Sequence, residues 1–379
     1  MRSLKFFLVC TAALAVLGGI LTGQQGPVRD PGATVAKPRK PADANGKPDD
    51  ADLPKIPSQY KKDKTGEPGT LPTFESNVDT VTVDVAVLDN KGHFIPGIPK
   101  GNFRILEDNV PQQLSGYSLG EAPMTVAMVI EFSNRFQRYW GPAWYQTLQL
   151  AWGFASTLKP QDYVAVVAFD LRPEILSDFT TDRTKTQEAL SRLQIAGFSE
   201  INLFDALTDT ADRMSGIEGR KAIVLIASGI DTFSKITFDK CRKSLQESGV
   251  PIYAIGLMQT LRELMDAYGA MGPIQRMDFL QADNELKTFA KETGGMAFFP
   301  RFQGEYPGIF GQIHEALRNQ YVLTYSPSNK AHDGTFRKIK VELVDPGTNQ
   351  PLPVKDEKGK PVKYTIVAKA GYKAPRAVE

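Results

Sequence analysis

The chain has 379 residues, of which 41% are hydrophobic, and its formal net charge is +2. This length and composition suit two or three globular domains. A charge so near neutrality gives no general attraction to nucleic acid or to an anionic membrane, and the sequence has no basic stripe interleaved with aromatic residues. Nucleic-acid binding is therefore disfavoured.

Residues 1–23 have the pattern of a secretory signal peptide. Arg2 and Lys5 precede an apolar run from Phe6 to Leu21, and small and polar residues follow. The run is shorter than the roughly 18 apolar residues that a spanning helix needs, which favours cleavage over a single membrane anchor. Lipidation at Cys10 is a minor alternative. We expect an exported protein, periplasmic, envelope-associated or secreted, with no membrane span after cleavage.

Residues 24–73 are rich in Pro, Lys, Asp and Gly and contain few aromatic or β-branched residues. Such a segment cannot bury enough apolar surface to offset the entropy that ordering costs, and we expect a disordered linker.

Residues 74–121 are expected to form a small β-module. Val81, Val83, Val85 and Val87 alternate with polar or small residues, a period of two that indicates a strand, and further short strands follow around a turn at 107–109. Residues 321–379 return to β patterns. Because each flank alone is too small to be stable, we predict that the two pair into one sandwich-like module around the intervening residues.

Residues 122–320 alternate strand and helix patterns. Buried strands are expected at 125–133, 162–170, 221–228 and 251–257, with weaker ones at 173–179 and 296–299. A helix is expected after the first of these strands, and the aromatic stripe around it, formed by Trp140, Trp144, Tyr145 and Trp152, is predicted to pack mostly in the core. This alternation indicates an α/β fold with a doubly wound, mainly parallel sheet and helices on both faces. The five other predicted helices lie at 184–194, 203–216, 238–249, 284–295 and 308–320.

Several segments carry a resemblance to a known family. They are VDVAVLDNKGHFIPGIPKGNFRILEDNVPQ, EAPMTVAMVIEFSNR, LFDALTDTADRM, KAIVLIASGIDT, NQYVLTYSPSN and KIKVEL. In order and spacing they resemble the von Willebrand factor A (vWA) domains, and among these the secreted bacterial type called the VWFA-related acidobacterial domain. The resemblance implies a Rossmann-like domain that binds macromolecular ligands, usually proteins, through a metal held at the carboxyl ends of the strands, the metal-ion-dependent adhesion site (MIDAS).

The residues at the MIDAS-like positions depart from that pattern. The family's Asp-x-Ser-x-Ser loop matches Glu131, Ser133 and Arg135, the Thr of its second loop matches Ile201, and the Asp of its third loop matches Ser228. A hard divalent cation prefers about six oxygen ligands, and a permanent cation beside it is repelled. We predict a degenerate site that binds neither Mg²⁺ nor Mn²⁺, with no other cofactor. Arg135 either points inward to pair with Glu131 or points to solvent.

Nothing in the sequence indicates catalysis. His93, His314 and His332 have no zinc-site spacing, and the sequence lacks both a nucleophile elbow and a phosphate-binding loop. Cys241, the one cysteine left after cleavage, cannot form an internal disulfide and is expected to be a half-buried structural thiol. We expect no catalytic residues.

These features favour an exported, non-enzymatic protein that mediates protein–protein interaction or adhesion in the envelope or outside the cell. The alternatives are a structural envelope component without a dedicated ligand and a hydrolytic enzyme. The partner is expected to be a protein, because Trp and Arg are favoured at interaction hot spots and cluster beside the degenerate loop. The candidate contact residues are Arg135, Phe136, Arg138, Tyr139 and Trp140.

Overall fold

The computed structural model describes residues 80–120, 123–135, 143–193, 197–217, 219–354 and 360–376, together with the backbone of residues 34–35. The predicted signal peptide and nearly all of the predicted linker lie outside the described residues. Within the described part of the chain, no helix is both long and apolar enough to cross a membrane.

The described residues of the α/β domain build one sheet in the order β1-β8-β7-β6-β9-β10-β11. The strands from β7 through β6, β9 and β10 to β11 run parallel, whereas β8 forms an antiparallel hairpin with β7 and β1 adds to the edge of β8. β1 falls within the predicted linker, where we expected no strand. The bounds are β1 (Thr34–Val35), β6 (Met124–Glu131), β7 (Tyr163–Phe169), β8 (Pro173–Thr180), β9 (Arg220–Ala227), β10 (Ile252–Gly256) and β11 (Ala297–Phe298).

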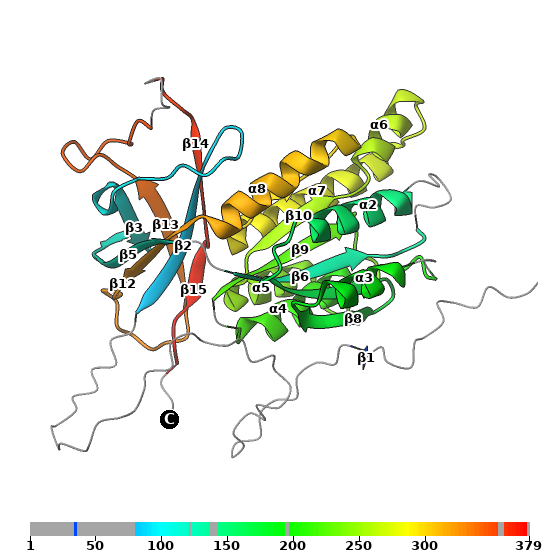
Figure 1. Cartoon of the computed structure of the whole chain (residues 1–379), viewed down its shortest axis with the longest axis horizontal. Helices are drawn as coiled ribbons and strands as arrows, with labels where there is room; N and C mark the ends of the chain where they lie inside the picture. The colour runs from blue at the N-terminus through cyan, green and yellow to red at the C-terminus, as the bar shows by residue number, and fades with distance from the viewer. Residues whose placement is uncertain are drawn as a thin grey trace, which may run out of the picture.

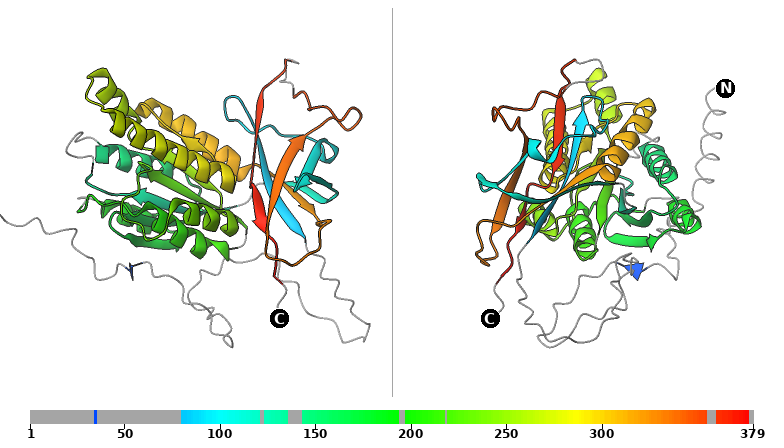
Figure 2. Two further views of the ribbon diagram at one scale, coloured as in Figure 1. Left: turned by 180° about the vertical axis from the view of Figure 1, so that it is seen from behind. Right: turned by 60° about the vertical axis from the view of Figure 1, so that its left-hand side comes forward.

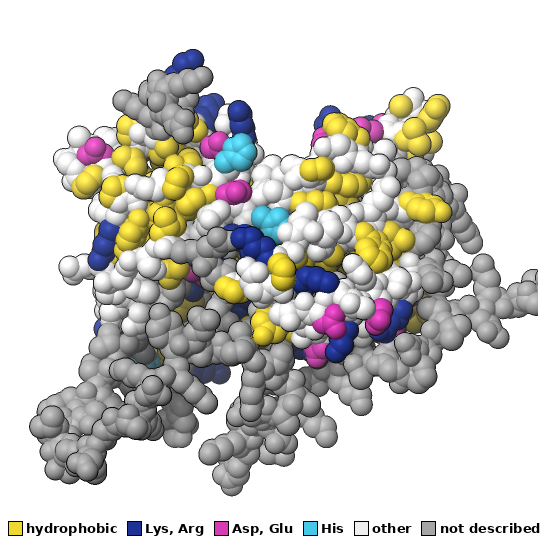
Figure 3. Space-filling view, viewed as in Figure 1, with side chains coloured by type: hydrophobic (Ala, Val, Ile, Leu, Met, Phe, Trp, Pro, Cys, Tyr) yellow, Lys and Arg dark blue, Asp and Glu magenta, His cyan; other side chains and the backbone are white. Residues whose placement is uncertain are grey.

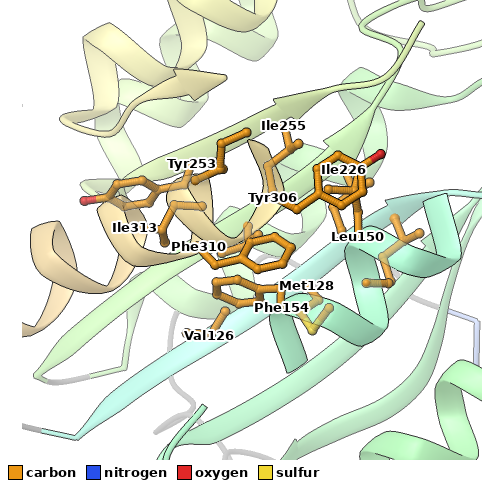
Figure 4. Close-up of a cluster of buried hydrophobic side chains, with 14 of the residues drawn as sticks. Val126, Met128, Leu150, Phe154, Ile226, Tyr253, Ile255, Tyr306, Phe310 and Ile313 are labelled. Atoms are coloured by element: carbon orange, nitrogen blue, oxygen red, sulfur yellow. The ribbon is translucent and has the colours of Figure 1, made fainter. Parts of the chain in front are cut away.

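Helices cover both faces of this sheet, as predicted (Figure 1). The central strand β6 is buried along its whole length, and its side chains alternate between two cores. Met128 packs with Phe154 and Phe310 on one face, and Val129 packs with Leu207 on the other. Figure 4 shows the first of these cores. One face carries α2 (Ala143–Ser156), α3 (Arg183–Ser191) and α8 (Tyr306–Arg318), and the other carries α4 (Leu203–Ser215), α5 (Phe238–Ser248) and α7 (Pro273–Thr293).

The two flanks of the chain pair with each other, as predicted. One sheet of the sandwich has the order β14-β2-β12-β5 and the other β15-β13-β3-β4, so each contains strands from both ends of the chain (Figure 2). A separate core of valine, isoleucine and tyrosine side chains lies between them. The bounds are β2 (Val81–Asp89), β3 (Phe103–Glu107), β4 (Val110–Gln112), β5 (Leu114–Gly120), β12 (Gln320–Tyr325), β13 (Phe336–Leu343), β14 (Tyr364–Ala368) and β15 (Gly371–Lys373), with short 3-10 turns η1 (Lys100–Asn102) and η2 (Gln303–Glu305).

The predicted core packing of the aromatic stripe on α2 is wrong for two of its residues. Tyr145 is 59% exposed and Trp152 is 38% exposed, whereas Leu150 and Phe154 are fully buried. The reason is the phase of the helix: Leu150 and Phe154 are four residues apart and share a face, while Tyr145 and Trp152 lie on another. The side chain of Trp144 lies outside the described residues.

The segment between β10 and the C-terminal half of α7 was not predicted as helical. It contains α6 (Gln259–Ala267) and the first turns of α7, which begins at Pro273. Gly249 and Gly294 adopt the left-handed conformation after α5 and α7, close to the ends predicted for these helices. These two helix ends could be predicted from the sequence, because glycine tolerates the left-handed conformation. The surface helix α6, which has few buried residues, was not predicted.

Candidate functional site

Three of the five MIDAS-like positions come together at the carboxyl edge of the sheet. Glu131 is the last residue of β6 and Ser228 follows the neighbouring parallel strand β9, so the two strand ends meet. The backbone N–H and the hydroxyl of Ser228 both donate to Oε2 of Glu131 over 2.7 Å. The hydroxyl of Ser133 donates to Oε1 of the same carboxyl over 3.1 Å. Both oxygens of Glu131 are therefore occupied by protein donors.

Glu131 is only 4% exposed. Burial raises its pKa, because the charged form loses its hydration, while the hydrogen bonds from Ser228 and Ser133 and the charge of Arg135 act in the opposite direction. The burial effect prevails. A proton is therefore held more firmly at this position than on an exposed glutamate.

Arg135 is exposed. Among the described residues its guanidinium forms no ion pair with Glu131, and it acts on that carboxyl only through its charge at a distance. Of the two orientations considered from the sequence, the structure has the outward one. Phe136, Arg138, Tyr139 and Trp140, the other candidate contact residues, lie outside the described residues.

Ile201 contributes no side-chain oxygen and is fully buried. Its backbone is fixed by the loop after β9: the N–H of Ile201 donates to Oγ1 of Thr232 over 2.8 Å, and its carbonyl accepts from the N–H groups of Thr232 and Phe233. The loop that carries Ile201 and the loop that carries Ser228 are thus joined by protein hydrogen bonds.

Asp231 stabilises the start of α4, a role that the sequence analysis did not predict. Its Oδ1 accepts hydrogen bonds from the backbone N–H groups of Leu203 and Phe204, which open α4, and the hydroxyl of Ser234 donates to the same carboxylate. Orphan N–H groups at a helix start favour such an acceptor. The Asp-x-x-Ser spacing of Asp231 and Ser234 is the signal that could have indicated it, although the capped helix lies far away in sequence.

The residues present do not fit a divalent cation. Glu131 supplies one carboxyl, whose two oxygens already accept from serines, Ile201 supplies no side-chain ligand, and Asp231 is committed to the start of α4. Within the part of the chain that the structure describes, no group of three or more His, Cys, Asp or Glu side chains is arranged to hold a metal ion. An oxygen-rich shell of about six ligands would require this network to break.

Large apolar side chains stand exposed on the segment after β10. Tyr268, Ile274 and Met277 are 78%, 77% and 70% exposed. Because α6 leaves the carboxyl end of β10, these side chains belong to the same edge of the domain as Glu131. Figure 3 shows hydrophobic side chains gathered at the upper right, where α6 stands in Figure 1. Exposed apolar groups of this size are a common mark of interaction surfaces.

In the described part of the chain, the hydrogen bonds of Glu131 involve neither a histidine nor Cys241. His93 is exposed beside Asp89, and His314 stacks on Phe154 while burial lowers its pKa to about 4. Cys241 is fully buried rather than half-buried as expected, and burial raises the pKa of its thiol to about 12. That thiol is protonated at neutral pH and is not a nucleophile. The absence of catalytic residues remains a prediction.

Comparison with known proteins gives a family match within the α/β domain. Residues 127–230 match the model of the von Willebrand factor type A domain. No curated protein matches the chain.

Three solved structures illustrate the structural similarity. Proximal thread matrix protein 1 of the mussel byssus is 11% identical with a TM-score of 0.40; the match covers 52% of this chain and 49% of that one, so the chain spans about half of it. The three N-terminal domains of the type V pili tip protein Mfa5 from Porphyromonas gingivalis are 11% identical with a TM-score of 0.40, covering 78% of each chain. A von Willebrand factor type A protein from Catenulispora acidiphila is 12% identical with a TM-score of 0.38, covering 79% of this chain and 75% of that one.

Proposed function

Because residues 127–230 belong to a von Willebrand factor type A domain, we propose that the protein binds another protein at the carboxyl edge of the sheet, without a divalent cation and without catalysis. It does so after export, in the envelope or outside the cell. The observation that carries this proposal is the Glu131 carboxyl, whose oxygens accept from Ser133 and Ser228.

A carboxylate used in this way holds the loops after β6 and β9 in one arrangement. A preformed edge loses little conformational entropy when a partner docks, which favours affinity. The same edge carries the exposed guanidinium of Arg135 and the exposed apolar side chains of Tyr268, Ile274 and Met277. Arginine and aromatic residues are enriched at interaction hot spots, and an exposed methionine adapts its shape to a partner.

Affinity capture from the native host tests this proposal. The mature protein and its variants Arg135→Ser and Met277→Ser serve as baits. A third variant, Trp140→Ala, tests another of the predicted contact residues. Two matched controls lie in the sandwich: Arg376→Ser removes another exposed arginine, and Leu119→Ser removes an apolar side chain that is 46% exposed. All captures are repeated with excess EDTA.

The expected result is a protein that the mature chain and both control variants retain, that the edge variants lose by about tenfold, and that EDTA does not release. A partner that EDTA releases would contradict the metal-free part of the proposal. If all variants retain the partner equally, the binding site lies outside this edge and the proposal is wrong. If no protein is retained, a structural envelope component is favoured instead. Mass spectrometry of the mature N-terminus tests export, since an intact Met1 contradicts cleavage.

A further inference from the structure

A second candidate site lies in the β-sandwich, far along the chain from Glu131. The first residues of β2, the β12–β13 loop and the segment from β14 to the end of β15 enclose a pocket of about 370 Å³. This volume lies at the lower end of the range of small-molecule sites. Its polar wall includes Thr82, Arg337, Lys369 and Lys373, and its apolar wall includes Val81 and Ala374.

The charged side chains that line this pocket are all basic. Among its described lining residues are Arg337, Lys369 and Lys373, together with His332, and no aspartate or glutamate. The carboxylates that pair with two of these cations stand outside the lining: Glu107 and Asp333 pair with Arg337, and Glu247 pairs with Lys373 over 2.8 Å.

The guanidinium of Arg337 is buried, and one of its N–H donors has no hydrogen-bond acceptor. Its side chain is 2% exposed, and its two terminal nitrogens are taken by Glu107 and by the carbonyl groups of Asn329 and Ala331. Its Nε–H is buried and has no hydrogen-bond partner. A buried donor without an acceptor costs about 1–3 kcal/mol.

Lys369 supplies a positive charge that no carboxylate balances directly. Among the described residues its ammonium forms no hydrogen bond or ion pair, and Asp84, outside the pocket lining, acts on it only at a distance. Burial lowers the pKa of Lys369, because the ammonium has lost part of its hydration. A partly desolvated, unpaired cation gains more from an incoming anion than a lysine in open water does.

We propose that this pocket binds a small organic carboxylate, with Lys369 as the charge partner and the apolar wall of Val81 and Ala374 against the carbon skeleton. The apolar wall selects an organic acid over inorganic phosphate, which has no carbon skeleton to bury. The hydroxyl group of Thr82, which lines the polar wall, can donate to a second carboxylate oxygen. This ligand site is independent of the edge that carries Glu131.

Titration of ¹⁵N-labelled protein with succinate tests the proposal. The amide signals of Lys369, Gly371 and Tyr372 report binding, and succinamide of the same shape but without charge is the ligand control. Lys369→Gln removes the charge and Lys369→Arg restores it. Lys338→Gln is the matched protein control, because Lys338 is an exposed lysine on β13 outside the pocket.

We expect saturable shifts at these amides with succinate and none with succinamide. Lys369→Gln should weaken succinate binding by about tenfold, as expected for loss of one charge-assisted contact, while Lys369→Arg and Lys338→Gln stay near the parent value. Equal affinity of the parent and Lys369→Gln overturns the proposal. If inorganic phosphate binds as tightly as succinate, the proposed selection of an organic acid is wrong. If the shifts are confined to other residues, the proposed location of the ligand is wrong.

Discussion

The backbone N–H and the hydroxyl of Ser228 converge on one oxygen of Glu131, each over 2.7 Å. In the vWA family pattern these two positions carry aspartates that serve a cation between them. Here a glutamate and a serine stand at these positions, and the glutamate carboxyl reaches the serine that follows β9. The two side chains therefore satisfy each other across the strand ends.

We predict that stability contributed by Glu131 falls as the pH rises. Burial raises the folded-state pKa above its usual value of 4.5, so between 4.5 and the raised value the folded protein holds a proton that the unfolded chain has released. The contribution is complete below pH 4.5 and is lost as the pH passes through the folded pKa. Glu131→Gln cannot ionise, so urea denaturation from pH 4 to 8 should show the parent losing stability relative to this variant.

Glu131→Ala is the control for the hydrogen bonds. It leaves the N–H and the hydroxyl of Ser228 without their acceptor and should cost about 1–3 kcal/mol at pH 4 relative to the parent, a difference that shrinks as the pH rises and the parent loses the contribution of Glu131. A stability difference between the parent and Glu131→Gln that is constant with pH would show that the carboxyl keeps the same charge in both states.

A second prediction concerns restoration of a metal site. We expect no saturable heat when the parent protein is titrated with Mg²⁺ or Mn²⁺. The combined variant Glu131→Asp, Arg135→Ser, Ile201→Thr and Ser228→Asp supplies the oxygens that the family pattern has and removes the nearby cation. It should bind Mn²⁺ measurably in calorimetry, because hard cations take carboxylate and hydroxyl ligands.

The control for this experiment is the variant with Arg135→Ser alone. If removal of the arginine is sufficient for binding, the serine–glutamate network is not the obstacle. Micromolar Mn²⁺ binding by the parent protein would contradict the metal-free site outright.

The fold was largely predictable because its signals are local. β6 is an unbroken apolar segment, and β2 and β13 alternate with a period of two, so most of their burial follows from residue type, with the buried Arg337 of β13 as an exception. The pairing of the two flanks was predictable from size, since neither could bury a core by itself. The helix α6 was not predicted although Leu261, Leu264 and Met265 have helical spacing; it is short, and only Leu261 of its nine residues is buried.

The candidate site was predictable only in part. The positions of Glu131, Ser133 and Ser228 follow from the carboxyl ends of neighbouring parallel strands, but the direction of the Arg135 side chain does not follow from a loop sequence. The contact of Asp231 with the start of α4 joins residues 28 apart in sequence, and the pocket around Lys369 joins both ends of the chain. Such partners are set by tertiary packing, which no single segment encodes.

A third prediction concerns Asp231. Asp231→Ala removes the acceptor of the first N–H groups of α4 and should lower the free energy of unfolding by about 1–2 kcal/mol, as other losses of a helix cap do. Asp231→Asn keeps an acceptor oxygen and should recover most of the loss. Thermal unfolding followed by circular dichroism measures both. An equal loss in the two variants would show that the negative charge, rather than the hydrogen bond, is what the helix start requires.

A fourth prediction concerns the reactivity of the Cys241 thiol. Cys241 lies fully buried against Thr208 and the carbonyl of Phe204, and burial raises its pKa to about 12. An aromatic disulfide reagent at pH 8 should therefore leave the folded protein unmodified and label it stoichiometrically in 8 M urea, about the concentration used for full unfolding of small domains. Rapid labelling without denaturant would mean that α5 opens readily from the sheet.

The last prediction concerns the junction of the two modules. Arg318 ends α8 just before β12 enters the sandwich, and its guanidinium pairs with Asp162, which is fully buried. Asp162 also accepts from the backbone N–H groups of Met124 and Lys159, so its charge is held by three elements at once. Arg318→Leu leaves this carboxylate buried without its cation and should cost about 3–5 kcal/mol.

Asp162→Asn with Arg318→Leu removes both charges while an amide oxygen still serves Met124 and Lys159. The double variant should therefore be more stable than Arg318→Leu alone, and equilibrium urea denaturation of the four combinations gives the coupling between the two residues. Additive effects would mean that the pair has no mutual dependence. A strong coupling makes the charge of Asp162, and not only the packing of the arginine stem, the reason that the end of α8 stays fixed against the start of β6.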